Sequence, residues 1–385
     1  MENGSATAGD AGAVRKAKRA TLLIFLVCGI GVATWAPMVP LTKQRMSLNE
    51  ADLGLILLLL GAGAIITMPF VGFFITRIGN KPVMLSASLV LALMLPVLTL
   101  IDTPVLMGAA LFVFGAGVGS LDVAMNAHAV VVQNRVGHPV MSTFHALFSV
   151  GGLLGSIGLG VLMLPGWSPT VAASVISVAI AVIALFQYRH LLPLEAEKGK
   201  RQSFRFPKGM ILLLGLFCFI AFLTEGALLD WSGIFLRADR GFGPAMAGSG
   251  YAVFSVAMAI MRFSGDGLVQ KFGAKKIVFS GSILAAFGLL LAVVVEGPFA
   301  ALAGFLLIGF GAANIVPVLF SAAGNAKGYA PGLALSAVTT LGYAGQLAGP
   351  ALIGFLAYFL TLPFTLGALA LPMVFVGICF RKMNT

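Results

Sequence analysis

Two carboxyl groups, Asp122 and Glu225, interrupt long apolar stretches of this sequence. An ionised side chain in hydrocarbon costs about 2.5–3.5 kcal/mol on insertion scales, so it is expected to face protein or a watery cavity. Gly115, Gly119, Asp122 and Asn126 follow one another at intervals of 4, 3 and 4 residues, so they share one helix face. This pattern is typical of a closely packed helix that presents a polar spot. We therefore predict that Asp122 takes up and releases protons; the alternative is a carboxyl that only hydrogen-bonds to a neighbouring helix.

The second acid, Glu225, lies near the middle of its apolar stretch, with Asp230 and Trp231 further along. Residues five apart differ by about 140° around a helix, so the two acids do not point at one ligand. We predict that Glu225 faces a cavity and shares the proton coupling. For Asp230, an outer gate and a structural hydrogen bond are both open, and Trp231 suits an interfacial anchor.

Two stripes of polar and small residues recur at matching positions. The first comprises His145, Ser149, Gly152 and Ser156, and the second, 194 residues later, comprises Thr339, Tyr343, Gln346 and Pro350. We expect both stripes to line a pathway and bind a solute, although close helix contact is favoured for Ser156 and Pro350. His145 suits a proton relay or a donor to a solute oxygen, and an interhelical hydrogen bond is the alternative.

Three further features carry polar groups into apolar stretches. Asn314 is followed by the helix breaker Pro317, so local unwinding is expected to expose backbone carbonyls to a ligand. Arg262 and Asp266 are four apart and can pair, which favours a gating or orienting role. Trp35 suits either stacking on a ring-shaped ligand or filling the core.

The composition indicates which elements position these side chains. Only 10% of the residues are charged and 59% are hydrophobic, with a mean hydropathy of +1.04. Because a soluble globular domain has about 25% charged residues, that class is excluded. Apolar runs of about 20 residues recur with short breaks, which predicts an all-α membrane protein. Its twelve transmembrane helices are expected at roughly 20–41, 50–75, 82–101, 105–131, 141–163, 168–188, 209–235, 247–269, 277–295, 298–323, 332–358 and 362–380.

A weak internal repeat indicates how the helices are grouped. Residues 72–160 reappear 194 positions later, so that Gly79 and Gly115 correspond to Gly273 and Gly309. Such self-similarity predicts two pseudo-symmetric six-helix bundles, typical of a transporter whose substrate lies between the halves. The predicted segments are a tail (1–19), the first bundle (20–188), a linker (189–208), the second bundle (209–380) and a second tail (381–385). Residues 1–14 are expected to be disordered.

The formal charge of +11 is distributed unevenly. If both termini lie on one side of the membrane, most Lys and Arg residues lie on that side. The cations on the opposite side are then Lys43, Arg45, Arg237 and Arg240. This asymmetry predicts that both termini are cytoplasmic. The positive charge then reports orientation and contact with anionic lipid, which argues against a nucleic-acid partner.

The remaining ionisable residues predict no further chemistry. Cys28, Cys218 and Cys379 lie far apart within apolar stretches, so we expect no disulfide, no metal site and no other cofactor. His128 and His138 lie off the polar stripes and are expected to carry no chemistry. No nucleophile–base constellation indicates an enzyme.

One loop resembles a family signature. Residues Gly72–Lys81 read GFFITRIGNK, which is similar to the G-x-x-x-D-R-x-G-x-K signature of the major facilitator superfamily. Within that superfamily the chain resembles the fucose-permease-related branch, especially the YbjJ-like bacterial inner-membrane group. The segments that carry this resemblance begin at Gly119, Glu225, Asn314 and Thr339. Thr76 stands where the signature has Asp, and Gln270 takes the equivalent place in the second half.

The resemblance implies alternating access and, in sugar-transporting members, proton symport with an acid at the position of Asp122. Arg77, in the signature loop, and Asp230, Arg262 and Asp266 are then expected to act in gating. The expected partners are a small polar solute, protons and the lipid bilayer of a bacterial inner membrane, and we expect a monomer. A drug/proton antiporter and a non-transporting receptor or lipid-handling protein are the alternatives.

Overall fold

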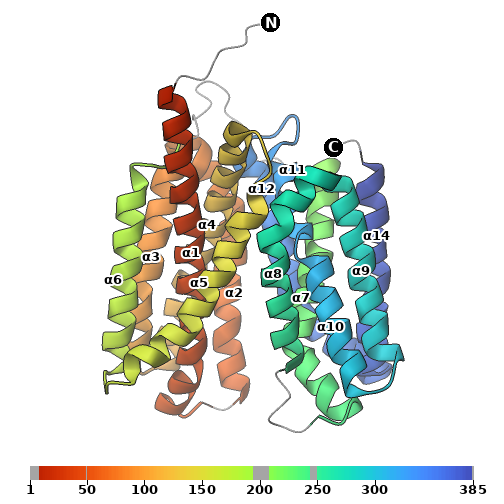
Figure 1. Cartoon of the computed structure of the whole chain (residues 1–385). Helices are drawn as coiled ribbons and strands as arrows, with labels where there is room; N and C mark the ends of the chain where they lie inside the picture. Colours follow the sequence, from red (N-terminus) through yellow and green to blue (C-terminus); the bar gives the residue numbers. More distant parts are fainter. Residues whose placement is uncertain (1–7, 49, 194–207, 243–248, 384–385) are drawn as a thin grey trace, which may run out of the picture. The chain divides into compact units, whose positions relative to one another are not determined.

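The computed structural model describes residues 8–48, 50–193, 208–242 and 249–383, and the regular structure in these ranges is helical (Figure 1). The helices are α1 (Ala8–Arg45), α2 (Glu50–Ile78), α3 (Asn80–Leu100), α4 (Pro104–Val136), α5 (Met141–Met163), α6 (Pro169–Tyr188), α7 (Met210–Asp239), α8 (Ser249–Phe272), α9 (Ala274–Val294), α10 (Pro298–Ala312), α11 (Ile315–Gly324), α12 (Pro331–Phe359), α13 (Leu362–Ala368) and α14 (Ala370–Lys382). Among the described residues, eleven helical stretches are long and apolar enough to cross a membrane. The predicted fold class is confirmed.

The main differences from the predicted helices are two breaks and one extension. The predicted helix 298–323 is divided into α10 and α11, and the helix 362–380 into α13 and α14. A proline follows each break: Ala313 lies four residues before Pro317, and Leu369 lies three residues before Pro372. Because proline has no N–H, the carbonyl four residues earlier, that of Ala313 or Ala368, lacks its helical donor. At the other end of the chain α1 begins at Ala8, so residues 8–14 are helical, contrary to the predicted disorder. Residues 1–7 and most of the predicted linker, 194–207, lie outside the described ranges.

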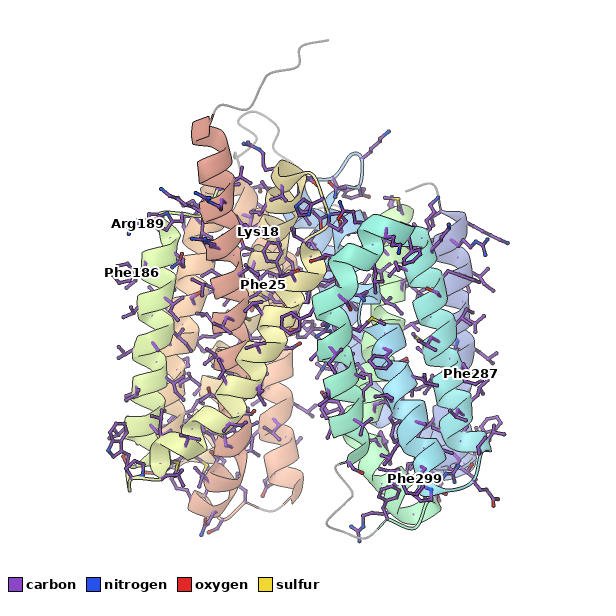
Figure 2. The ribbon with its side chains drawn as sticks, viewed as in Figure 1. Lys18, Phe25, Phe186, Arg189, Phe287 and Phe299 are labelled. Atoms are coloured by element: carbon purple, nitrogen blue, oxygen red, sulfur yellow. The ribbon has the colours of Figure 1, made fainter. Side chains whose placement is uncertain are left out.

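The chain divides into two compact units. The first contains residues 1–138, 144–206 and 328–336, and the second contains 139–143, 207–327 and 337–385. In the first unit α4 packs against α2 and α3, and α6 packs against α3. In the second unit α9 packs against α10 and α14, and α8 packs against α10. Each unit turns apolar side chains outward, as Phe186 on α6 and Phe287 on α9 illustrate (Figure 2).

The sequence repeat is also a structural repeat. Gly79 precedes α3 at φ 85°, ψ 162°, and Gly273 precedes α9 at φ 83°, ψ 151°. This backbone region is essentially restricted to glycine. A Cβ on Gly115 of α4 would collide with the carbonyl of Leu60, and one on Gly309 of α10 would collide with that of Phe254. Both glycines and both carbonyls are 194 residues apart, so the two units use the same close helix contact.

A second pair of contacts repeats between α1 and α5 in the first unit and between α7 and α12 in the second. The α5 residue Gly151 packs against the carbonyl of Leu26 in α1, and the α12 residue Gly345 packs against that of Phe219 in α7. In both places a Cβ would meet backbone atoms. Glycine therefore lets the helices that carry the polar stripes approach the first helix of their unit closely.

Arginines close the ends of α3 and α9. Arg45 donates to the carbonyls of Leu98 and Thr99 at 2.8 and 2.7 Å, and its Nε lies 3.2 Å from Asp102. Arg240 donates to the carbonyls of Ala292 and Val293 at 3.0 and 2.7 Å. The last carbonyls of a helix lack intrahelical donors, and the arginines supply them.

A buried histidine fixes the chain after α6. His128 is fully buried; its Nε2 accepts the backbone N–H of Leu192 at 3.0 Å, and its Nδ1 lies 2.9 Å from the hydroxyl of Thr21. Thr21 in turn donates to the carbonyl of Ala17 at 2.8 Å. Since Nε2 is an acceptor, the neutral ring carries its proton on Nδ1 and donates it to Thr21. These contacts give His128 a structural role.

Candidate functional site

An ionic cluster lies between α7 and α8 in the second unit. Arg262 of α8 lies within electrostatic range of Glu225 of α7 and of the phenol of Tyr251, and Asp230 lies within range of the same phenol. The phenol of Tyr251 also hydrogen-bonds with Ser255. Glu225 and Arg262 are both partly buried. An acid and a base that share an apolar surrounding neutralise each other, which lowers the cost of keeping either one there.

The break between α10 and α11 brings backbone polar groups to this cluster. Because Pro317 has no N–H, the carbonyl of Ala313 lacks its usual donor four residues on. The Nε of Arg262 approaches this carbonyl at 3.4 Å. The predicted unwinding beside Asn314 is therefore present, and the carbonyl that it exposes contacts an arginine.

Asn314, the residue before α11, is packed tightly against α8. Its Nδ2 donates to the carbonyl of Met261 at 3.3 Å, while its buried Oδ1 has no hydrogen-bond partner in the described part of the chain. A Cβ on Gly265 would overlap this side chain. Glycine at 265 therefore makes the room that the Asn314 amide occupies.

The stripe on α12 adjoins the same turn of α7. Backbone and side-chain atoms of Gln346 lie 3.0–3.5 Å from where a Cβ of Gly226 would stand, next to Glu225. The ring of Tyr343 lies 5.8 Å from that of Phe222. Thr339 is fully buried, and its hydroxyl has no hydrogen-bond partner among the described residues. The second unit thus places Tyr343 and Gln346 of α12 against the turns of α7 that carry Phe222 and Gly226, next to Glu225.

In the first unit, Asp122 and Asn126 form a pair one helical turn apart. The Nδ2 of Asn126 donates to the backbone carbonyl of Asp122 at 2.8 Å and to its Oδ1 at 3.3 Å. Asp122 is 8% exposed and Asn126 is fully buried. Cys28 of α1 lies close enough for its thiol to interact with the charge of Asp122. The acid therefore faces α1 with an amide beside it.

The other residues predicted for the first unit lie on α1 and α5. His145 is buried, and its ring meets that of Phe25 edge to face at 5.4 Å. Ser149 donates to the carbonyl of His145 at 3.2 Å. Trp35 is 6% exposed, and its Nε1 has no hydrogen-bond partner within the ranges that the structure describes.

The residues predicted to gate have different surroundings. Arg77 is exposed and lies over the ring of Phe73 at 5.3 Å, and Asp230 is also exposed. Asp266 accepts the backbone N–H groups of Ser142 and Thr143, each at 2.8 Å, together with the hydroxyl of Thr143. The pairing predicted from sequence was with Arg262, but the carboxylate oxygens of Asp266 bind these N–H groups at the start of α5. The first backbone N–H groups of a helix lack intrahelical partners and attract a negative charge.

Sequence reasoning missed one residue of the cluster, Tyr251, and the contact of Asp266 with the start of α5. Tyr251 precedes Arg262 by 11 residues, about three helical turns, which places both on one face of α8. The sequence therefore contained a signal that Tyr251 lies on the same helix face as Arg262. The contact of Asp266 with Ser142 and Thr143 joins residues more than 120 positions apart, and local spacing contains no such information.

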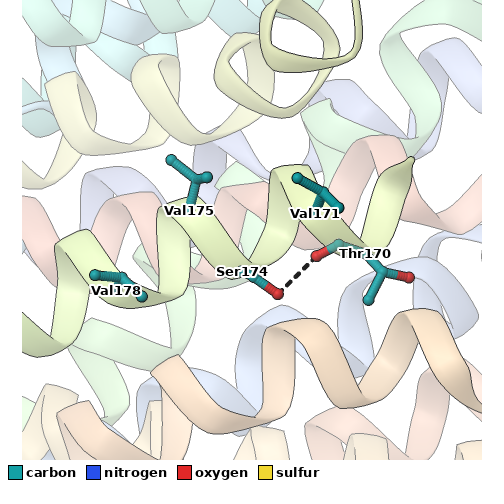
Figure 3. A pocket seen from close by; sticks show the side chains of 5 residues that line it. All are labelled: Thr170, Val171, Ser174, Val175 and Val178. Carbon is teal, nitrogen blue, oxygen red and sulfur yellow. Dashed lines mark hydrogen bonds between the residues drawn. The ribbon is translucent and has the colours of Figure 1, made fainter. Parts of the chain in front are cut away.

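Each unit contains a hollow. One, of about 360 Å³, runs along α6 beside Thr170, Ser174 and three valines (Figure 3). Ser174 donates to the carbonyl of Thr170 at 2.7 Å, so the lining of this groove is mainly apolar. The other, of about 510 Å³, lies among α8, α9 and α10 and includes Met261, Lys276 and Asn314 in its lining. Across the described ranges, no group of three or more His, Cys, Asp or Glu residues is placed to hold a metal.

Comparison with known proteins yields several likenesses. Residues 21–350 match the family description Major Facilitator Superfamily. A Yersinia pestis protein named an uncharacterized MFS-type transporter is 44% identical over 364 residues, which cover 94% of this chain and 95% of that protein. Among solved structures, the E. coli fucose:proton symporter FucP superposes with a TM-score of 0.78 at 16% identity, covering 95% of this chain and 98% of that one. The proton:xylose symporter XylE gives 0.76 at 14% identity, covering 98% and 97%.

Proposed function

Because the chain belongs to the major facilitator superfamily, we propose that it is a secondary active transporter that moves a small polar solute together with protons. The solute class is a sugar or sugar derivative, and the mechanism is alternating access. FucP is a fucose:proton symporter and XylE is a proton:xylose symporter, and the likeness of their folds to this one supports this class. The transporter is proposed to act as a monomer in a bacterial inner membrane, with both termini in the cytoplasm.

The environment of Asp122 carries this proposal. In the described part of the chain its side chain has one hydrogen-bond partner, Asn126, and no cation interacts with its charge. Protonation removes the charge and with it the cost of burial, whereas ionisation requires access to water. The protonation state of a buried carboxyl without a cation beside it therefore depends on whether its surroundings are open to water.

The other residues are assigned by surroundings. Glu225 is proposed as the second proton-exchanging acid, because Arg262 interacts with its ionised form. The proposed solute ligands are polar or aromatic side chains of the two units: Trp35, Asn126, His145, Ser149, Asn314, Thr339, Tyr343 and Gln346. Gating is assigned to Arg77, Asp230, Arg262 and Asp266.

The test measures solute uptake into proteoliposomes with and without an inward proton gradient. Wild type is expected to concentrate a solute from a panel of sugars and derivatives, and Asp122→Asn is expected to abolish the gradient-dependent part by fixing the neutral form. Asp239→Asn, which neutralises an exposed acid at the end of α7, is the matched control. Gradient-driven uptake that persists in Asp122→Asn would refute the role of Asp122. A protein stabilised by lipophilic cations and by no polar solute would instead favour a drug/proton antiporter.

A further inference from the structure

The hollow among α8, α9 and α10 lies where two membrane-spanning helices meet. α8 ends at Phe272 and α9 begins at Ala274, and each helix is long and apolar enough to cross a membrane. Phe272 and Lys276, on either side of this turn, both line the hollow. The turn lies at the same end of the second unit as the last turn of α14 (Figure 1). The hollow therefore lies where the hydrocarbon core of a bilayer borders its headgroups.

Small residues leave the space that the hollow occupies. A Cβ on Gly281 of α9 would collide with the carbonyl of Gly311 of α10, so the two helices touch here through their backbones. The neighbouring Ser280 is small and exposed, and its hydroxyl donates to the carbonyl one helical turn earlier at 2.7 Å. Larger apolar side chains, among them Phe272 and Phe310, border the space. The result is a hollow of about 510 Å³ with mainly apolar walls.

Three cations surround the hollow. Lys276 belongs to its lining, and the side chain is exposed. The Nζ of Lys271 lies 5.3 Å from the centroid of the Phe272 ring, which lines the hollow. The Cζ of Arg381, from the end of α14, lies 4.8 Å from the centroid of the Phe279 ring, which also lines it. Among the described residues, no carboxylate lines the hollow or forms an ion pair with these cations, so its rim is positively charged.

An apolar hollow with cations at its rim matches a lipid that has an acidic headgroup. An acyl chain covers the apolar walls, which would otherwise remain exposed. Basic pockets between transmembrane helices bind anionic lipid headgroups, because the cations attract the phosphate. A zwitterionic lipid is attracted less strongly, since its ammonium group is repelled by the same cations. A soluble phosphate compound has the charge but no chain to cover the walls.

We propose that this hollow is a binding site for an anionic phospholipid of the bilayer. One acyl chain lies along the apolar walls, and the phosphate lies among Lys271, Lys276 and Arg381. Asn314, proposed above as a solute ligand, belongs to the lining of the same hollow, so the lipid would lie against a helix that also carries part of the solute site. The inference concerns lipid binding and does not depend on the identity of the solute or on proton coupling.

The experiment measures lipid retention by native mass spectrometry of the purified full-length protein. The mixed micelles contain dioleoyl-phosphatidylglycerol and dioleoyl-phosphatidylethanolamine, which have the same acyl chains. Wild type is expected to retain one phosphatidylglycerol in preference to phosphatidylethanolamine. The double variant K276Q/R381Q is expected to bind this lipid about 25-fold more weakly, because each cation near an anionic lipid surface contributes about a factor of five. The matched control K275Q/K382Q removes the adjacent charge from each of the same helices, outside the lining, and is expected to bind like wild type.

A further variant fills the hollow and leaves its charges in place. Ser280→Phe puts a ring where the acyl chain is proposed to lie, at an exposed position, and is expected to abolish the preference for phosphatidylglycerol. Ser264→Phe, at an exposed site of α8 outside the lining, is the control and is expected to keep the preference. Thermal unfolding of the two variants shows whether they fold equally well.

The outcomes separate a built site from ordinary lipid contact. A preference for phosphatidylglycerol that is lost in K276Q/R381Q and in Ser280→Phe, and is kept in both controls, supports the proposal. Equal retention of the two lipids by wild type, or an equal loss in K275Q/K382Q, would refute it in favour of general surface contact. A preference that persists in Ser280→Phe would refute the role of the hollow. Displacement of the lipid by an equal concentration of glycerol 3-phosphate would assign the cations to a soluble phosphate instead. Since lipid retention is measured without transport, failure of the proposed function would not change this result.

Discussion

The contact between Gly265 and Asn314 yields a prediction whose size follows from the structure. In Gly265→Ala the new methyl group would overlap the amide of Asn314 and lie 2.7 Å from the hydroxyl oxygen of Ser142. Displacing the amide breaks its hydrogen bond to Met261, worth about 1 kcal/mol, and overpacking costs about 1–3 kcal/mol more. Alanine returns about 1 kcal/mol through its higher helix propensity. The expected net loss is about 1–3 kcal/mol.

The assay is thermal unfolding of purified protein, in which each kcal/mol corresponds to about 2–4 °C. Gly267→Ala is the matched control, because it lies two residues further along α8 and a Cβ there meets nothing within 4 Å. It is expected to leave stability unchanged or raise it by up to about 1 kcal/mol. The double variant G265A/N314A removes the overlap with Asn314, leaves the contact with Ser142, and is expected to recover part of the loss. Equal melting temperatures for Gly265→Ala and Gly267→Ala would refute the packing argument.

Two further substitutions test the repeated features of the fold. Gly79→Ala forces a side chain into a backbone conformation that only glycine adopts readily, and it is expected to lower the free energy of unfolding by about 1–3 kcal/mol. The control is Gly152→Ala, at a helical site where a Cβ meets nothing within 4 Å. Equal unfolding temperatures for the two variants would contradict the argument from backbone strain. Arg240→Ala removes the donors to two carbonyls of α9 and is expected to lower the free energy of unfolding by about 1–3 kcal/mol. Thermal unfolding is expected to show a larger effect than for the control Arg237→Ala, at an exposed site of α7. A smaller effect than that of Arg237→Ala would contradict the capping role.

The helices and their repeat could be predicted from the sequence because both depend on local information. Membrane spans follow from runs of apolar residues, and Gly79 and Gly273 keep their offset of 194 because each must start a helix in the same backbone conformation. The break at Asn314 was predicted from Pro317 for the same reason. Yet Pro69 and Pro96 lie inside unbroken helices, so a proline alone does not determine where a helix is interrupted.

The partners of the polar side chains could not be predicted in the same way. The spacing of Arg262 and Asp266 describes one helix, whereas the structure gives Asp266 the N–H groups that begin α5 and brings Arg262 within electrostatic range of Glu225 of α7. These contacts depend on which helix faces meet. A periodic pattern shows that a face is polar, but it does not identify the face that packs against it.

The arginines that close α3 and α9 affect how the membrane topology can be tested by mutagenesis. Arg45 and Arg240 belong to the minority of cations predicted to lie away from the cytoplasm, and both are held by backbone carbonyls. Neutralising them to strengthen the charge bias would uncap two helices, so a change in insertion would be confounded with a change in folding. Reporters of topology are better combined with lysines added at exposed loop positions, which alter the bias and leave both caps in place.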